Sequence, residues 1–170
     1  LFIGFWGLVL VTLFLLTTIG AADAEPGKVK ASAAKSMVIL GGADLALIVG
    51  VGLIFALTGS LTISETSVAA TSGMAVAAFI LVLVGAMSKA GAMPLHSWIP
   101  DMAEAAPTSV SALLPASIDK LLGIYLLPRL VLNVFDVSLG LNVLLMIIGA
   151  VTIVAGVVMA MVQHDLRKLL

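Results

Sequence analysis

The chain has 170 residues, of which 62% are hydrophobic and only 10% are charged, whereas soluble domains contain about 25% charged residues. A net charge of −1 excludes the basic surface that nucleic-acid binding requires, and the absence of cysteine excludes disulfides, thiolate metal sites and iron–sulfur ligation in this chain. Two histidines are too few for a metal cluster. The composition therefore predicts an all-α, polytopic transmembrane helix bundle in a lipid bilayer.

Five apolar runs are long enough to cross a bilayer, because about 20 helical residues span the hydrocarbon core. A polar loop at Gly20–Lys30, with a Pro-Gly turn signal, and a second loop at Leu61–Thr71 separate the first three runs. The predicted spans, all parts of one transmembrane domain, are residues 1–19, 35–60, 72–90, 108–132 and 137–163, with a short segment at 93–102 after the third.

The two ends of the chain favour a piece of a longer protein. The sequence starts without Met, and its last residues, HDLRKLL, start a further charged element. The first run lacks a basic n-region and a small-residue cleavage pattern, which favours an internal span over a signal peptide.

Basic residues are found in alternate loops, which predicts the orientation of the bundle. Lys28 and Lys30 follow the first span, Arg167 and Lys168 follow the fifth, and the loop at Leu61–Thr71 has no Lys or Arg. By the positive-inside rule, the first loop and the C-terminal residues are expected in the cytoplasm. We therefore expect a multi-pass protein of the cell membrane.

The fourth span carries two charged residues near its middle. Asp119 and Lys120 lie roughly 17 Å beyond Thr108, the predicted N-cap, and a charge at this depth costs several kcal/mol. Adjacent residues project from a helix in different directions, so we expect the two to have different partners. Lys120 shares its stripe with small residues such as Gly123, which leaves room for a helix or for water. The pattern is compatible with a structural ion pair or with a proton or ion relay.

The end of the third span carries a lysine beside a predicted break. Pro94 removes a backbone donor and Gly91 precedes it, so the helix is expected to break close to Lys89, and broken membrane helices are tolerated where they line a cavity. Helix-end carbonyls at such a break favour a cation. His96 follows and is either a proton carrier or a hydrogen-bonded interfacial histidine. A buried lysine can release a proton when its acidic neighbour moves, whereas arginine stays charged.

Three further acids have weaker assignments. Asp44 lies within the second span, where it is either a counter-charge or a polar group for helix packing. Asp101 and Glu104 are expected in a solvated loop at the cytoplasmic mouth. We see no flavin, quinone or metal motif, so we expect no cofactor and no redox chemistry in this chain.

The central stretch SKAGAMPLHSWIPDMAEAAPTSVSALLPASIDKLLGIYLLPRL resembles the antiporter-like membrane subunits. These include the large proton-pumping subunits of respiratory complex I, Mrp-type sodium/proton antiporters and membrane subunits of group 4 [NiFe] hydrogenases. The tail MVQHDLRKLL is similar to the start of the next helix in this family, so the spans resemble helices five to nine of about fourteen. The residues that match the central motif are Lys89, Pro94, Leu95, His96, Trp98, Pro100, Asp101, Pro107, Thr108, Val110, Ser111, Ala112 and Leu113.

The resemblance implies a water-linked proton relay. Lys89 matches the lysine of the family's broken seventh helix, and Lys120 matches a lysine on the eighth. The family's partner acid lies in a pattern like F-W-E-L, and here that position is Gly7. We therefore expect Asp119 to supply the counter-charge, and Asp44 to contribute less. The stretch DKLLGIYLLPR together with the pattern around Gly7 resembles the hydrogenase-associated branch.

Two functions from different classes follow. The first is a proton-translocating, or sodium-translocating, subunit driven by a redox module on another chain. The second is a non-conducting membrane anchor that docks a hydrogenase or NADH dehydrogenase module, which Gly7 favours and Lys89, Lys120 and the broken helix disfavour. A stand-alone metabolite transporter ranks third, because no substrate pocket is evident. The expected partners are other membrane subunits, a peripheral redox module and the lipid bilayer.

Overall fold

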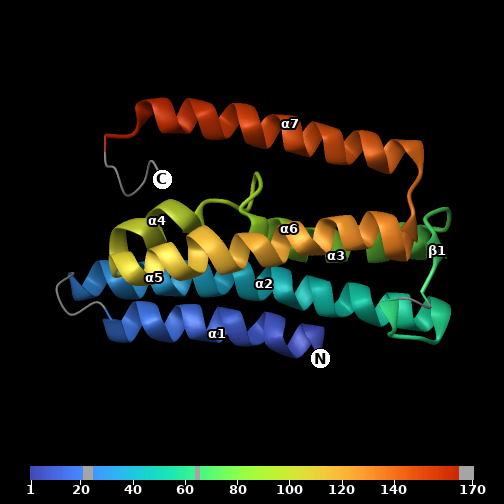
Figure 1. Cartoon of the computed structure of the whole chain (residues 1–170), viewed down its shortest axis with the longest axis horizontal. Coiled ribbons are helices and arrows are strands. Elements are labelled where there is room, and N and C mark those ends of the chain that lie inside the picture. Colours follow the sequence, from blue (N-terminus) through green and yellow to red (C-terminus); the bar gives the residue numbers. More distant parts are fainter. Residues whose placement is uncertain (21–24, 64–65, 165–170) are drawn as a thin grey trace.

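A computed structural model describes residues 1–20, 25–63 and 66–164. Its helices lie side by side along one long axis (Figure 1). Within the described residues, five helical segments are long and apolar enough to cross a membrane. The elements in chain order are α1 Phe2–Gly20, α2 Pro26–Thr58, β1 Val68–Ala69, α3 Gly73–Ala90, α4 Trp98–Ala105, α5 Thr108–Leu113, η2 Leu114–Ile118, α6 Asp119–Arg129, η3 Leu130–Val134, β2 Phe135–Asp136 and α7 Leu139–Val162. The predicted polytopic transmembrane bundle is confirmed.

Helix α2 begins earlier than the sequence pattern predicted. Pro26 and Gly27 were interpreted as a turn, but Pro26 is the first helical residue. Proline suits this position because its missing N–H would have no intrahelical partner there and its φ angle is already helical. The predicted loop at Gly20–Lys30 is therefore wrong from Pro26 onward, and residues 21–24 lie outside the described residues. At the other end, Gly59 closes α2 in the left-handed conformation with φ 71°.

The fourth span is a chain of four helical pieces. The π-helical turn η2 joins α5 to α6, and a second π-helical turn, η3, follows α6. Pro115 lies in η2 and Pro128 lies just before η3, where a missing backbone donor favours an irregular turn over a regular α-helix. Thr108 is the first residue of α5 and not its N-cap, since Pro107 occupies that position.

The predicted break after the third span is present. Gly91 adopts the left-handed conformation with φ 76°, and the amides of Gly91 and Ala92 both donate to the carbonyl of Met87. Glycine is suited to this C-terminal position because it has no Cβ. After the turn the chain forms the short helix α4, so Asp101 and Glu104 are helical residues and not part of a loop.

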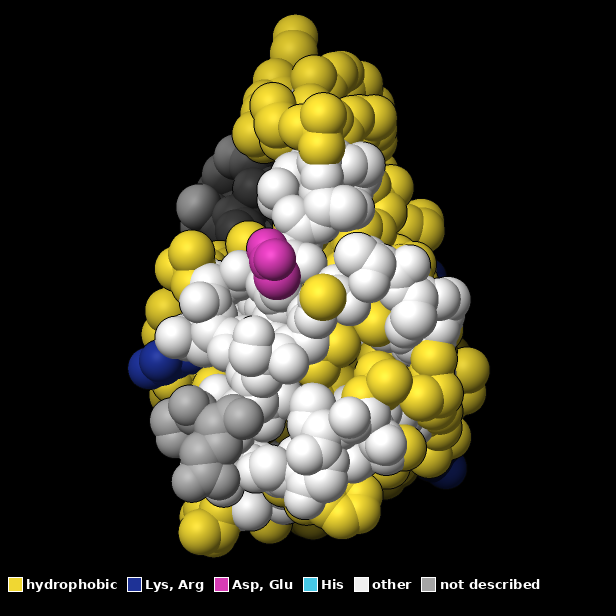
Figure 2. Space-filling model, turned by 90° about the vertical axis from the view of Figure 1, so that its right-hand side faces the viewer, with side chains coloured by type: hydrophobic (Ala, Val, Ile, Leu, Met, Phe, Trp, Pro, Cys, Tyr) yellow, Lys and Arg dark blue, Asp and Glu magenta, His cyan; other side chains and the backbone are white. Residues whose placement is uncertain are grey.

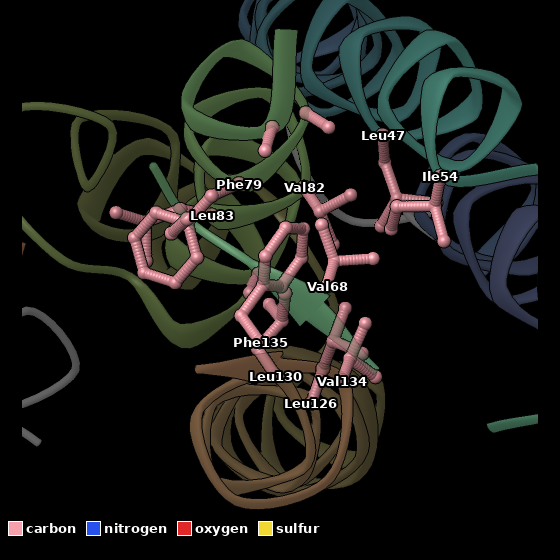
Figure 3. Close-up of a cluster of buried hydrophobic side chains, with 14 of the residues drawn as sticks. Leu47, Ile54, Val68, Phe79, Val82, Leu83, Leu126, Leu130, Val134 and Phe135 are labelled. Atoms are coloured by element: carbon pink, nitrogen blue, oxygen red, sulfur yellow. The ribbon is translucent and has the colours of Figure 1, made fainter. Parts of the chain in front are cut away.

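The main core lies where α2, α3 and α6 meet. Figure 3 shows members of this core, among them Leu47 and Ile54 of α2, Phe79 and Val82 of α3 and Leu126 of α6. Within the predicted loop at residues 61–71, two residues instead form β1, which pairs in parallel with β2. This pairing ties the turn after α2 to the end of the fourth span.

Helix α7 lies apart from the other helices (Figure 1). Among its described side chains only Leu141 is buried. Figure 2 shows the end of the molecule that carries the turn after α2, with hydrophobic side chains around its outline, an acidic side chain on it and basic side chains only at its edge. The apolar outer surface is what a helix bundle presents to lipid or to neighbouring helices.

Candidate functional site

Lys89 is at the centre of a buried charged cluster. It lies in the last turn of α3, one residue before the helix ends, and its side chain is 0% exposed. Its Nζ is 3.5 Å from Oδ1 of Asp119 and 3.8 Å from Oδ2 of Asp44. Carbonyls at the end of a helix favour a cation. The helix break and the two acids therefore both favour a positive charge at the position of Lys89.

Asp44 reaches the cluster from α2. It lies on the buried face of that helix together with Leu40 and Leu47. Trp6 of α1 donates its indole N–H to Oδ1 of Asp44 over 2.7 Å, which leaves Oδ2 turned to Lys89. The Trp6 ring centroid is 5.2 Å from Lys89 Nζ, within the range of a cation–π contact.

Asp119 reaches the cluster from the opposite side, on α6. It is the first residue of α6, directly after the π-helical turn η2, and it is 0% exposed. It lies on the same face of α6 as Gly123 and Leu126. This face packs against α3. The structure thus brings together Asp44, Lys89 and Asp119 from three helices.

The geometry of this cluster is loose. Both distances to Lys89 Nζ exceed the roughly 2.7–2.9 Å of a direct charge-assisted hydrogen bond. A buried charge without a partner costs several kcal/mol, so the three groups depend on one another. One lysine faces two carboxylic acids and can approach either by a small side-chain movement. Such an arrangement can hold a proton on nitrogen and pass it to a carboxylate oxygen.

Lys120 lies on a different side of α6 from Asp119. It lines a cavity of about 510 Å³ between α4, α5, η2 and α7, which His96 also lines. Thr108, Ser111 and Thr152 contribute hydroxyl groups to the same wall. Across the described ranges Lys120 makes no ion pair with any residue. The predicted site residues therefore form two groups, with Lys120 and His96 at the cavity and the other three in the buried cluster.

The break between α3 and α4 connects these two groups. Trp98 of α4 donates its indole N–H to the carbonyl of Ser88, the neighbour of Lys89, over 3.1 Å. The amide of Met93 donates to Thr152 of α7, also over 3.1 Å. Gly91 and Met93 line the cavity, so the cavity reaches the turn that directly follows Lys89.

A second cavity, of about 460 Å³, lies on another face of α4, against the start of α2, and its lining includes several charged residues. Here Lys35 of α2 forms an ion pair with Asp101 of α4, with 2.6 Å between Nζ and Oδ2. Both side chains are about half exposed, so the pair is open to solvent. This contact and the one between Trp6 and Asp44 were missed by sequence analysis, because both join residues far apart in the chain.

Gly7 lies next to Trp6 and supplies no acid to the cluster. A Cβ added at Gly7 would meet no atom within 4 Å. Near this part of α1, the acid that faces Lys89 is Asp44 of α2, which accepts a hydrogen bond from Trp6.

Comparisons with known proteins identify the family to which the chain belongs. Residues 1–170 match the family model "NADH:quinone oxidoreductase/Mrp antiporter, TM". The chain is 37% identical over 142 residues to a Na(+)/H(+) antiporter subunit of Alkalihalophilus pseudofirmus, covering 81% of this chain and 17% of that protein. It is 30% identical over 171 residues to hydrogenase-4 component B of Escherichia coli, covering 98% and 25% respectively. NADH-quinone oxidoreductase subunit N 2 of Aquifex aeolicus is 34% identical over 169 residues, covering 96% and 33%.

A solved structure has the same fold. A chain of the Mrp complex from a Dietzia species matches with a TM-score of 0.85 at 22% identity, over 99% of this chain and 32% of that chain. This chain spans between 17% and 33% of the length of the three curated relatives named above. The family model matches the whole chain, so this multi-pass membrane protein belongs to the antiporter-like family shared by Mrp antiporters, NADH:quinone oxidoreductases and hydrogenase membrane components.

Proposed function

We propose that this chain is part of a proton-translocating membrane subunit, driven by a redox module on another chain. The observation that carries this proposal is a fully buried lysine between carboxylates from two other helices, at a broken membrane helix. Ionisable groups at such depth are costly, and in membrane proteins they mark ion and proton paths. Its partners would be other membrane subunits and a peripheral module of hydrogenase or NADH dehydrogenase type, in the cell membrane.

In this proposal, a proton leaves Nζ of Lys89 for a carboxylate oxygen of Asp44 or Asp119, and Nζ is later protonated again. Lys120 and His96 line the cavity at the break and are the groups that exchange protons with water there. Small movements of Lys89 between its two acids change which carboxylate it faces. The direction of transport would follow from coupling to the partner complex.

The sharpest test replaces Lys89 by arginine. Arginine keeps the positive charge between the two acids but does not release its proton, so a structural ion pair is retained and a relay is blocked. We expect Lys89→Arg to accumulate in the membrane and to lose substrate-driven proton uptake in inverted vesicles, measured by quenching of a pH-sensitive dye. Lys28→Arg is the matched control, because Lys28 is exposed and pairs only with Glu25 among the described residues.

Uptake is compared per amount of assembled protein. Normal uptake by an assembled Lys89→Arg protein would exclude the relay and favour the alternative, a non-conducting membrane anchor. The observation in favour of that alternative is Gly7, which occupies the position of the family's partner acid. Repeating the assay with and without sodium distinguishes proton from sodium translocation.

A further inference from the structure

The face of α6 that packs on α3 has glycine at its closest point. The buried residues of α6 and η3 are spaced as one helical stripe, and they are Asp119, Gly123, Leu126, Leu130 and Val134. Asp119 and Gly123 are four residues apart and therefore lie on the same side of α6, one turn from each other. Sequence analysis assigned Gly123 to the stripe of Lys120, but the structure turns it to α3.

At Gly123 the backbones of the two helices are in direct contact. A Cβ added there would lie 2.5 Å from the carbonyl oxygen of Ala86 and 2.9 Å from the Cα of Ala90, and it would also clash with the Ala90 amide nitrogen. Real Cβ atoms do not approach other atoms this closely, and backbone atoms cannot rotate away. Among the glycines of the described residues, Gly123 is the one whose three nearest obstacles are all backbone atoms.

This contact lies beside the charged cluster, because Ala90 is the residue that follows Lys89. Asp119 is one turn before Gly123, so the distance between the two backbones at Gly123 determines how far the Asp119 carboxylate must reach. To accept a Cβ at normal contact distance, α6 would have to move away by about 1 Å. The distance of 3.5 Å from Asp119 to Lys89 would then exceed the roughly 4 Å limit of an ion pair.

We propose that Gly123 is a positioning residue that sets the distance between Lys89 and Asp119. Its lack of a side chain brings the backbones of α3 and α6 close enough for the short aspartate side chain to reach Lys89. The helix contact at Gly123 sets this distance whatever the chain transports. The expected effect on transport rests on the proposed function.

The test is a rescue experiment in the intact protein. Gly123→Ala should lower proton uptake per assembled protein at least tenfold, because α6 is displaced. Asp119→Glu alone should also lower uptake severalfold, because the added methylene, about 1.5 Å long, overfills a gap suited to aspartate. Combined, the two substitutions should restore at least half of the normal uptake, because the longer acid spans the wider gap.

The matched control is Gly50→Ala. A Cβ at Gly50 is also crowded, by Val82 and the carbonyl of Ala78, but at the contact of α2 with α3. Asp119→Glu should give no rescue of Gly50→Ala. A Gly123→Ala, Asp119→Glu protein that performs no better than Gly123→Ala alone would overturn the proposal. Normal uptake by Asp119→Glu alone would also overturn the proposal. This single variant is the test that remains if Gly123→Ala does not accumulate.

A second readout does not depend on transport. The coupling between Lys89→Met and Asp119→Asn, measured by a double-mutant cycle of thermal unfolding midpoints, should fall by more than half in the Gly123→Ala background. Unchanged coupling would refute the role of Gly123. Lost coupling in a protein whose Lys89→Arg variant transports normally would refute the proposed function and leave the role of Gly123 intact.

Discussion

Trp6 and Asp44 form the shortest contact of the charged cluster, at 2.7 Å. The indole N–H of Trp6 donates to Oδ1 of Asp44 over 2.7 Å, and the tryptophan ring also lies against Lys89. A side chain of α1 thereby fixes the rotamer of an acid on α2, so that the second oxygen of this acid faces Lys89 on α3. With Asp119 on α6, which also pairs with Lys89, four helices thus share one buried polar network in which each charged member needs a partner.

The first prediction concerns Trp6→Phe. The substitution keeps an aromatic ring but removes the only donor that the described residues offer to Oδ1 of Asp44, and hydrogen bonds to charged groups contribute about 1.5–3 kcal/mol. We expect a lower unfolding midpoint and lower proton uptake. Trp98→Phe is the control, because buried Trp98 also loses an indole hydrogen bond, in this case to the neutral carbonyl of Ser88. Equal uptake per protein in the two variants would contradict the role of Trp6.

The second prediction compares the two acids. Asp119 is closer to Lys89 and fully buried, with no other side-chain partner among the described residues, whereas Asp44 is also held by Trp6. We expect Asp119→Asn to impair proton uptake at least tenfold and Asp44→Asn to impair it less. Both variants are to be compared at equal protein level. Normal uptake by a well-expressed Asp119→Asn protein would remove Asp119 from the relay.

Local signals in the sequence were sufficient for the spans and the break. Apolar runs of membrane length are continuous in the sequence, and Gly91 and Pro94 act within about one helical turn, so their effects can be predicted without knowing the neighbouring helices. The beginning of α2 was predicted wrongly because proline has the same appearance in a turn and at the first position of a helix. Strands β1 and β2 have two residues each, which is too short for the alternation of apolar and polar residues that predicts a strand.

The side on which each charged residue lies was harder to predict. Helix α2 is apolar on nearly all sides, so the periodicity does not show that Asp44 faces Lys89. Gly123 lies three residues after Lys120 and four after Asp119, and only the packing of α6 on α3 assigns it to the stripe of Asp119. The ion pair between Lys35 and Asp101 joins residues 66 positions apart, for which a single sequence has no signal.

The third prediction is the orientation in the membrane. Lys28 and Lys35 lie at the end of the bundle where α2 begins, and the turn after α2 contains no basic residue. The positive-inside rule therefore places the beginning of α2 in the cytoplasm. We expect Thr62→Cys, but not Ala31→Cys, to react with a membrane-impermeant thiol reagent in intact cells, since both side chains are exposed in the structure. The opposite labelling pattern would reverse the orientation.

The last prediction separates the two lysines by stability. Lys89 lies between two buried acids, so Lys89→Met leaves both without their cation, and removing one partner of a buried ion pair costs about 3–5 kcal/mol. Lys120 lines the cavity and, within the described residues, has no acidic partner that its loss would leave unpaired. We therefore expect Lys89→Met to lower the unfolding midpoint clearly and Lys120→Met to leave it unchanged, while both abolish proton uptake.

His96→Gln, which changes another lining residue of the same cavity, should lower uptake without affecting stability. If Lys120→Met is as unstable as Lys89→Met, Lys120 has a structural partner and is not a freely exchanging group; if it transports normally, the cavity is not part of the proton path.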